Sequence, residues 1–152
     1  MNDTVVARPC WTILAQKAED KIALIQNEMS YLRNHLAGLK NSQARVQKMY
    51  DEYRDGLKQT DANSVGMREA MNQRQFMSQL LTLLQRVETD IQYTENALIG
   101  VKEKLIAAER ERIKMQTLAD QNAQAVQRAE DKKDQRRMDA LGVMQFNLKP
   151  QI

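Results

Sequence analysis

The sequence predicts an all-α protein, a long antiparallel two-helix coiled-coil hairpin with a protruding C-terminal helical arm. Three observations support this fold class. The 152 residues are rich in helix formers and include only two Pro and five Gly, which is typical of long helices. Two long segments carry apolar residues at alternating spacings of three and four, the pattern of helices that pack on other helices. A short polar segment separates them, and short connections favour antiparallel neighbours.

The first helix is expected over residues 9–57, after a disordered N-terminus at residues 1–8. Pro9 suits the first turn of a helix, where its missing N–H removes no hydrogen bond. Thirteen of the fourteen heptad core positions that follow are apolar or aromatic, and Gln43 is the exception. These positions are Trp11, Ala15, Ala18, Ile22, Ile25, Met29, Leu32, Leu36, Leu39, Gln43, Val46, Tyr50, Tyr53 and Leu57.

A turn is expected over residues 58–66, where Asp, Asn, Ser and Gly cluster and offer the backbone alternatives to a helix. Asn63 or Ser64 is placed to cap the next helix. The second helix is expected over residues 67–141, ending before Gly142, with a flexible tail at residues 142–152. Its core positions are Met77, Leu80, Leu84, Val87, Ile91, Thr94, Leu98, Val101, Leu105 and Ala108, of which only Thr94 is polar.

The two heptad patterns also predict a register, within a single hairpin domain over residues 9–141. If the turn is centred near residue 62 or 63, Trp11 at the start of the first helix faces Lys114 and Met115. The apolar pattern of the second helix weakens just where this partner ends. We therefore expect residues 116–141 to form an arm that is either a solvated charged helix or a segment that docks into a partner.

Charge, cysteine content and hydropathy narrow the possible functions. Charged residues make up 28% of the chain, yet the net charge is only +3. Acidic and basic residues alternate, which indicates a solvated helix surface and argues against nucleic-acid binding. Cys10 is the only cysteine, so an intrachain disulfide and a cysteine-based metal cluster are excluded. No stretch approaches the roughly 18 apolar residues of a membrane span, and no secretory signal is evident, so a cytoplasmic protein is expected.

The residues that could support catalysis are few. His35, the only histidine, lies beside the core position Leu36 and is interpreted as a solvated flanking residue. Cys10 lacks the second residue that would make a nucleophile pair with it. The sequence shows no glycine-rich phosphate loop and no metal-ligand spacing. We therefore expect no enzymatic activity, no cofactor and no metal site.

Binding is better supported, because the start of the second helix has more apolar residues than one helix contact uses. Phe76 and Leu83 are seven residues apart and form a second apolar row beside the core positions, and Leu81 adds to the surplus. Two interpretations remain open. These side chains widen the hairpin core, or they form an exposed surface for a partner.

Three short motifs stand out along the chain. They are Tyr50-Asp51-Glu52-Tyr53-Arg54 with Leu57 before the polar turn, Gln75-Phe76 with Leu80, and Ala129-Glu130-Asp131-Lys132-Lys133-Asp134 with Met138-Asp139. Together they resemble motifs of the FliJ family, the stalk proteins of the bacterial flagellar export ATPase complex, and the resemblance covers nearly the whole chain. The related stalk of injectisome type III secretion is the nearest alternative.

This resemblance implies a non-enzymatic stalk that binds the hexameric export ATPase ring and the cytoplasmic domain of the export gate, and that hands over export chaperones. It implies a location at the flagellar base, with membrane association only through partners. By motif, Phe76 and Leu80 would contact the gate, and we add the neighbouring Leu83 to that surface. The arm would reach the ATPase ring through Lys132, Lys133, Arg136 and Arg137.

Two other functions stay open. A chaperone that holds unfolded clients would need apolar residues exposed at the helix ends. A plain coiled-coil scaffold would need only the helix pairing itself.

Overall fold

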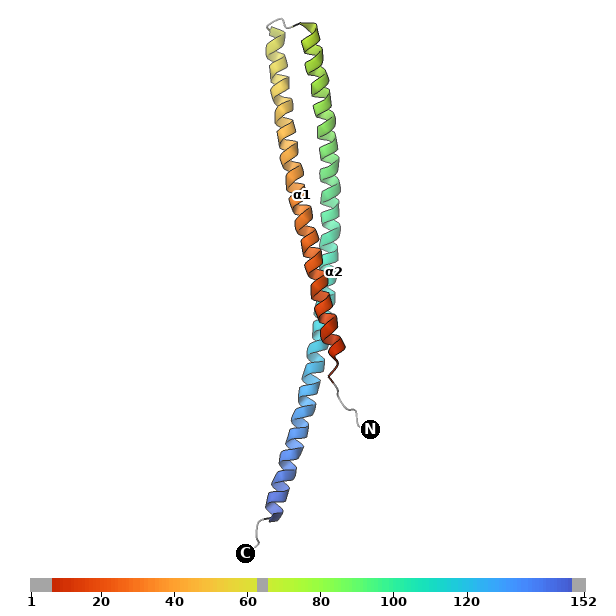
Figure 1. Cartoon of the computed structure of the whole chain (residues 1–152), viewed down its shortest axis with the longest axis vertical. Helices are drawn as coiled ribbons and strands as arrows, with labels where there is room; N and C mark the ends of the chain where they lie inside the picture. Colours follow the sequence, from red (N-terminus) through yellow and green to blue (C-terminus); the bar gives the residue numbers. More distant parts are fainter. Residues whose placement is uncertain (1–6, 63–65, 149–152) are drawn as a thin grey trace. The chain divides into compact units, whose positions relative to one another are not determined.

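The computed structural model describes residues 7–62 and 66–148, which form two α-helices and no strand (Figure 1). Helix α1 spans Pro9–Ala62 and helix α2 spans Met67–Leu148. The chain reverses direction between them, so the helices pack antiparallel. The predicted all-α helical hairpin is therefore confirmed.

The helix starts follow from local chemistry. Pro9 opens α1, and the Arg8 carbonyl accepts a hydrogen bond of 3.2 Å from the Trp11 N–H. At the start of α2, the Gly66 carbonyl accepts bonds from the N–H groups of Glu69 (3.1 Å) and Ala70 (3.3 Å). Glu69 places a negative charge in the first turn, where the helix dipole favours it. The predicted caps Asn63 and Ser64 lie outside the described residues.

Both helices extend further than the sequence predicts. Helix α1 continues past Leu57 to Ala62, and α2 continues past Leu141 to Leu148. The α1 extension runs into the predicted turn, because turn-favouring residues such as Asp61 only weaken a helix, and the α2 extension runs through Gly142. A glycine within a helix costs about 1 kcal/mol relative to alanine but removes no backbone hydrogen bond, so it does not end a long helix. The expected tail at residues 142–152 is therefore helical as far as Leu148, and residues 1–6 and 149–152 lie outside the described part.

The chain divides into two compact units, which we describe separately. The hairpin unit is Leu24–Leu105 and contains the loop end of the hairpin. The terminal unit combines Met1–Ala23 with Ile106–Ile152. That residues 9–141 form one hairpin domain stays a prediction.

The hairpin unit buries the predicted apolar positions between its two helices. The most enclosed core residues are Ile25 and Met29 of α1 with Leu80, Val87, Ile91, Leu98 and Val101 of α2. Half-buried positions lie between them: Leu32, Leu36, Leu39, Val46, Leu84 and Leu105. The two faces thus meet as heptad packing predicts. Along α1 burial weakens toward the loop, since Val46 is less enclosed than Ile25, whereas α2 keeps the well-buried Leu80 near the loop.

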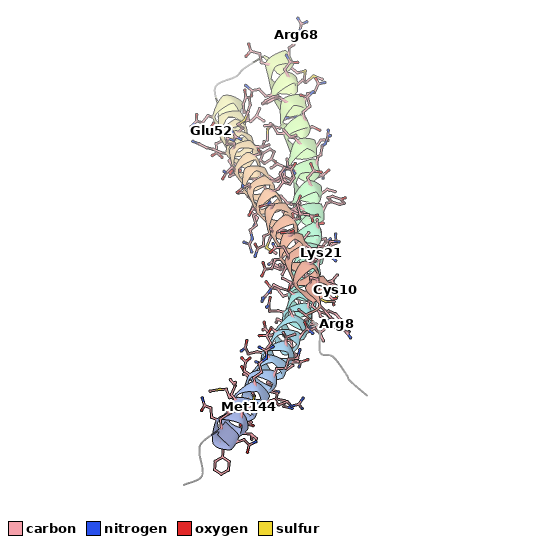
Figure 2. The ribbon with its side chains drawn as sticks, turned by 60° about the horizontal axis from the view of Figure 1, so that its bottom comes forward. Arg8, Cys10, Lys21, Glu52, Arg68 and Met144 are labelled. Atoms are coloured by element: carbon pink, nitrogen blue, oxygen red, sulfur yellow. The ribbon has the colours of Figure 1, made fainter. Side chains whose placement is uncertain are left out.

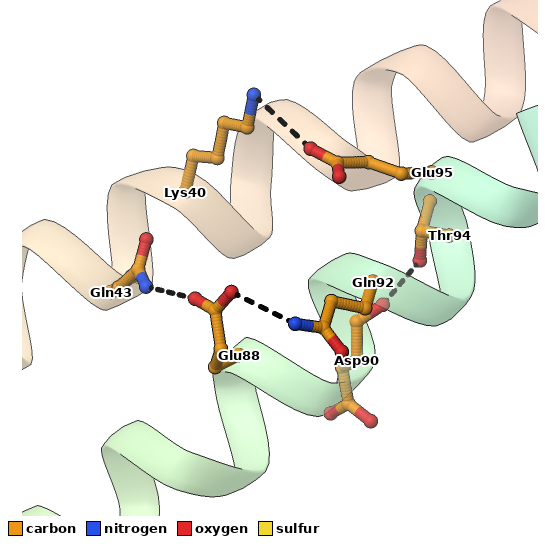
Figure 3. Close-up of polar contacts among 7 residues, drawn as sticks. All are labelled: Lys40, Gln43, Glu88, Asp90, Gln92, Thr94 and Glu95. Atoms are coloured by element: carbon orange, nitrogen blue, oxygen red, sulfur yellow. Dashed lines mark hydrogen bonds and ion pairs between the residues drawn. The ribbon is translucent and has the colours of Figure 1, made fainter.

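Polar contacts between the helices report the register of the hairpin unit (Figure 3). Gln43 on α1 donates to the Glu88 carboxylate on α2 at 2.7 Å, and Lys40 pairs with Glu95 at 3.7 Å. Nearer the loop, the Tyr53 ring contacts the Phe76 ring. In each of these three contacts, the α2 residue lies about one helical turn or more further along α2 than a turn centred at residue 62 or 63 predicts. The longer α1 accounts for part of this shift, because the two helices are now joined between Ala62 and Met67.

The terminal unit pairs the start of α1 with the middle of α2. The Arg8 N–H donates to Asn122 Oδ1 at 2.9 Å, and Ala15, Ile22 and Ala108 are buried. Pairing thus reaches at least Asn122, beyond the Met115 limit that the sequence predicts. A cavity of about 220 Å³ lies between the helices and is lined by Thr12, Ala15, Gln16, Glu19, Gln116, Ala119, Asp120 and Ala123.

Candidate interaction surfaces

The Phe76 surface of the hairpin unit, which we define by Tyr53, Phe76 and Leu83, lies toward the loop. Phe76 is half-buried because its ring packs against Tyr53 of α1, with centroids 4.8 Å apart and planes tilted by 55°. This geometry is a favourable aromatic arrangement. The contact covers part of Phe76, and the side chain as a whole stays half-buried. Leu83, two helical turns along the same side of α2, is 44% exposed.

The structure separates Leu80 from the other two predicted gate residues. Leu80 is only 5% exposed and lies in the core of the hairpin unit. Its position one turn beyond Phe76 turns it toward α1, whereas Leu83 falls on the flank of the helix. Leu80 is therefore placed to support the Phe76 surface and not to form part of it. Leu81 is exposed to the same 44% on the opposite flank of α2.

A small cavity adjoins the Phe76 surface and was not evident from the apolar pattern. It measures about 230 Å³ and is lined by Glu52, Tyr53, Gly56 and Gln73. The side-chain oxygen of Gln73, Oε1, is buried and has no hydrogen-bond partner among the described residues. Extending the heptad frame of Leu80 backwards puts Gln73 at a core position. This polar residue at a core position is the feature of the sequence that could have indicated the cavity.

The predicted ATPase-binding residues Lys132, Lys133, Arg136 and Arg137 all lie on the exposed arm of α2 in the terminal unit. Every side chain from Glu130 to Leu148 is exposed. The helical repeat puts Lys132 and Arg136 on one side of the arm and Lys133 and Arg137 on another. Arg137 pairs with Asp134 at 3.9 Å, a weak surface contact.

Beyond this basic region, α2 ends in a terminal segment, residues 141–148, that the sequence pattern predicts to be a flexible tail. In the structure it is helical, and Met144 lies near its end (Figure 2). Its apolar side chains, each more than half exposed, are Leu141, Val143, Met144, Phe146 and Leu148. They point around the whole helix and not along one side. A helix that is apolar on all faces normally lies inside other protein, so this segment is a second candidate contact.

The residues considered for catalysis are not gathered into a site. Cys10 is exposed near the start of α1 (Figure 2). His35 stacks on Tyr31 one turn away, with ring centroids 6.2 Å apart and planes nearly parallel. Within residues 7–62 and 66–148, no group of three His, Cys, Asp or Glu side chains is placed to hold a metal ion. The same residues include no helix apolar enough over a sufficient length to span a membrane.

The fold and these surfaces define the class of protein: a coiled-coil hairpin whose exposed apolar and charged side chains suit contacts with other proteins. The family model described as Flagellar FliJ protein matches residues 12–151, and the chain belongs to this family. Its members are non-enzymatic components of flagellar type III protein export, so the chain has a role in that export. No curated protein and no solved structure matches the chain in the comparisons made.

Proposed function

We propose that this protein is a stalk and adaptor that binds both the hexameric export ATPase ring and the cytoplasmic domain of the export gate. In this role it couples ATP hydrolysis to protein export and hands over export chaperones. It acts at the cytoplasmic face of the inner membrane at the flagellar base and reaches the membrane only through its partners. Family membership over residues 12–151 supports the export role.

The observation that carries the gate assignment is the Phe76 surface of the hairpin unit. Leu83 is 44% exposed beside an aromatic pair that is only half-covered. Clustered exposed apolar and aromatic side chains mark protein contacts more often than isolated ones do. Leu80 contributes by supporting this surface from the core. The ring assignment depends on the arm, where Lys132, Lys133, Arg136 and Arg137 are all accessible.

The gate assignment is tested by two matched substitutions on α2. Leu83→Asp places a charge on the Phe76 surface, and Leu81→Asp places it at equal exposure on the opposite flank. We expect Leu83→Asp to weaken binding of the purified gate domain by tenfold or more, since truncating or charging a central contact costs about 2 kcal/mol. Phe76→Ala should act in the same direction. Binding is measured by calorimetry and function by swimming in soft agar.

The control variant Leu81→Asp should bind the gate domain and swim as the wild type does. Helicity should be unchanged in Leu81→Asp and Leu83→Asp, since neither leucine lies in the core. Equal losses for Leu81→Asp and Leu83→Asp, or normal gate binding by Leu83→Asp, would reject the assignment of this surface.

One observation favours a second function, a chaperone that holds unfolded clients. Exposed apolar side chains lie at both ends of α2, with Met67 and Met71 at the start and Phe146 and Leu148 at the end. Flexible methionine side chains adapt to varied partners. Suppression of client aggregation by a protein that fails to bind the export ATPase would favour this chaperone over the stalk.

A further inference from the structure

The cavity beside the Phe76 surface contains an unexplained polar atom. Gln73 Oε1 is buried and accepts no hydrogen bond from any described residue. A buried acceptor without a donor costs about 1–3 kcal/mol, and native structures contain few of them. Because Oε1 is buried while Gln73 lines the cavity, the side chain has to turn into the cavity before this oxygen can accept from a donor that enters there.

The other groups that line the cavity indicate the chemical class of the hydrogen-bond donor that it binds. Glu52 brings a carboxylate, and Tyr53 brings an aromatic ring. Both attract cations, the first by charge and the second through its π electrons. The Glu52 carboxylate contacts Lys48 at 4.0 Å, but both side chains are mostly exposed. A contact of that length on a helix surface is worth only tenths of a kcal/mol, so Glu52 is available to a stronger partner.

The size of the cavity points to a single side chain. Small-molecule sites usually measure about 300–1,000 Å³, whereas this one is about 230 Å³ and lies on a helix pair. Among cationic side chains, arginine is the best match for the three groups. Its planar guanidinium donates several hydrogen bonds in fixed directions and stacks on aromatic rings, which lysine does not do.

We propose that this cavity binds an arginine side chain of the export gate's cytoplasmic domain, a partner that rests on the function proposed above. The guanidinium donates to Gln73 Oε1 and to the Glu52 carboxylate while it lies against Tyr53. The apolar part of the same gate segment covers Phe76 and Leu83. The cavity thus adds a charged, directional contact to an apolar surface and sets which segment fits.

The first experiment uses the full-length chain and a probe in place of the gate. N-acetyl-arginine methylamide is titrated while the Gln73 side-chain amide and the Tyr53 ring are followed by NMR. The same titration with the uncharged citrulline derivative controls for shape. We expect saturable shifts at Gln73 and Tyr53 in the millimolar range with arginine alone. Equal shifts with citrulline, or no saturation with arginine, would overturn the proposal.

Two variants change the cavity and are expected to leave the fold intact, so that a loss of arginine binding is not caused by unfolding. Gln73→Leu removes the acceptor. Gly56→Leu adds a side chain at a residue that lines the cavity, and a Cβ at Gly56 meets nothing within 4 Å, so the helix accepts it. Both should abolish the arginine shifts at Tyr53 with unchanged helicity, while Gln79→Leu on the exposed side of α2 should leave them intact. Retention of the Tyr53 shifts in Gln73→Leu and Gly56→Leu would reject the cavity as the site.

A final measurement separates this proposal from the gate assignment. Gln73→Leu and Gly56→Leu should bind the purified gate domain about tenfold more weakly than the wild type. If the wild type binds the gate domain and both variants bind it equally well, the arginine contact is rejected while the gate assignment stands. If the wild type does not bind the gate domain but still binds the arginine probe, the gate assignment fails while the arginine-binding cavity stands.

Discussion

Individual residues in the hairpin unit show how strongly position on a helix decides the role of a side chain. Ile91 and Ile99 are chemically identical and lie on the same helix, yet they are 5% and 57% exposed. Thr94 lies at a core position and is 3% exposed, but its hydroxyl donates to the Asp90 carbonyl at 2.8 Å. Its polarity is therefore satisfied within its own helix. Gln73 is the contrasting case, because its buried oxygen has no such partner.

The isoleucine pair gives a prediction for stability. Ile91→Ala should lower the free energy of unfolding by about 2–5 kcal/mol, since it removes buried methylenes and leaves a cavity. Ile99→Ala should change it by less than about 0.5 kcal/mol, because surface substitutions away from special features are nearly neutral. Urea denaturation followed by circular dichroism measures both. Similar losses in the two variants would mean that Ile99 is covered in solution.

At the scale of the helices, a polar contact accompanies the apolar core. Gln43 is the single polar residue among the core positions predicted for α1, and it donates to Glu88 of α2 at 2.7 Å. A polar residue at a core position usually specifies register at some loss of stability. Lys40 and Glu95 add an exposed ion pair nearby, which contributes less than about 1 kcal/mol.

The role of Gln43 can be measured by replacing it with leucine. Gln43→Leu should raise the free energy of unfolding by about 1 kcal/mol, since apolar area replaces a half-buried amide. Glu88 is exposed and stays solvated, so no buried charge is left unpaired. Lys40→Ala serves as the comparison and should change stability by less than about 0.5 kcal/mol. A clear loss of stability in Gln43→Leu would show that the bond to Glu88 outweighs apolar burial.

For the molecule as a whole, the terminal unit exposes the arm of α2, the surface that we propose binds the ATPase ring. Lys132, Lys133, Arg136 and Arg137 lie on a helix that is exposed from Glu130 to Leu148. None of these side chains contributes to a core. Their substitution therefore tests binding without disturbing the fold.

Replacing these four basic residues with glutamine should reduce stimulation of the purified export ATPase several-fold and weaken its dependence on salt, because exposed charges act through screened attraction. The matched control replaces four exposed basic residues earlier in α2, which are Lys102, Lys104, Arg110 and Lys114. That control should stimulate the ATPase normally. If the arm variant stimulates the ATPase as strongly as the wild type does, the four basic residues do not bind the ring. The apolar terminal segment, residues 141–148, then becomes the candidate contact.

The sequence by itself determined the helices, their antiparallel pairing and the family. Heptad spacing and helix propensity are local properties, so positions such as Ile91 and Val101 could be assigned to the core without a structure. The surplus of apolar residues around Phe76 was visible for the same reason. The basic arm could also be predicted, because a helical segment with many charged residues and few apolar core positions is expected to be exposed.

Tertiary structure decided which side chains the partner helix covers. Leu80 and Leu83 are equally apolar, yet only Leu83 stays exposed, because the approach of α1 selects one side of α2. The register, the cavity at Gln73 and the pairing as far as Asn122 depend on where α1 ends. The sequence pattern does not locate that end or the helical terminal segment, because turn-favouring residues such as Asp61 and a glycine such as Gly142 weaken a helix by amounts that a long helix tolerates.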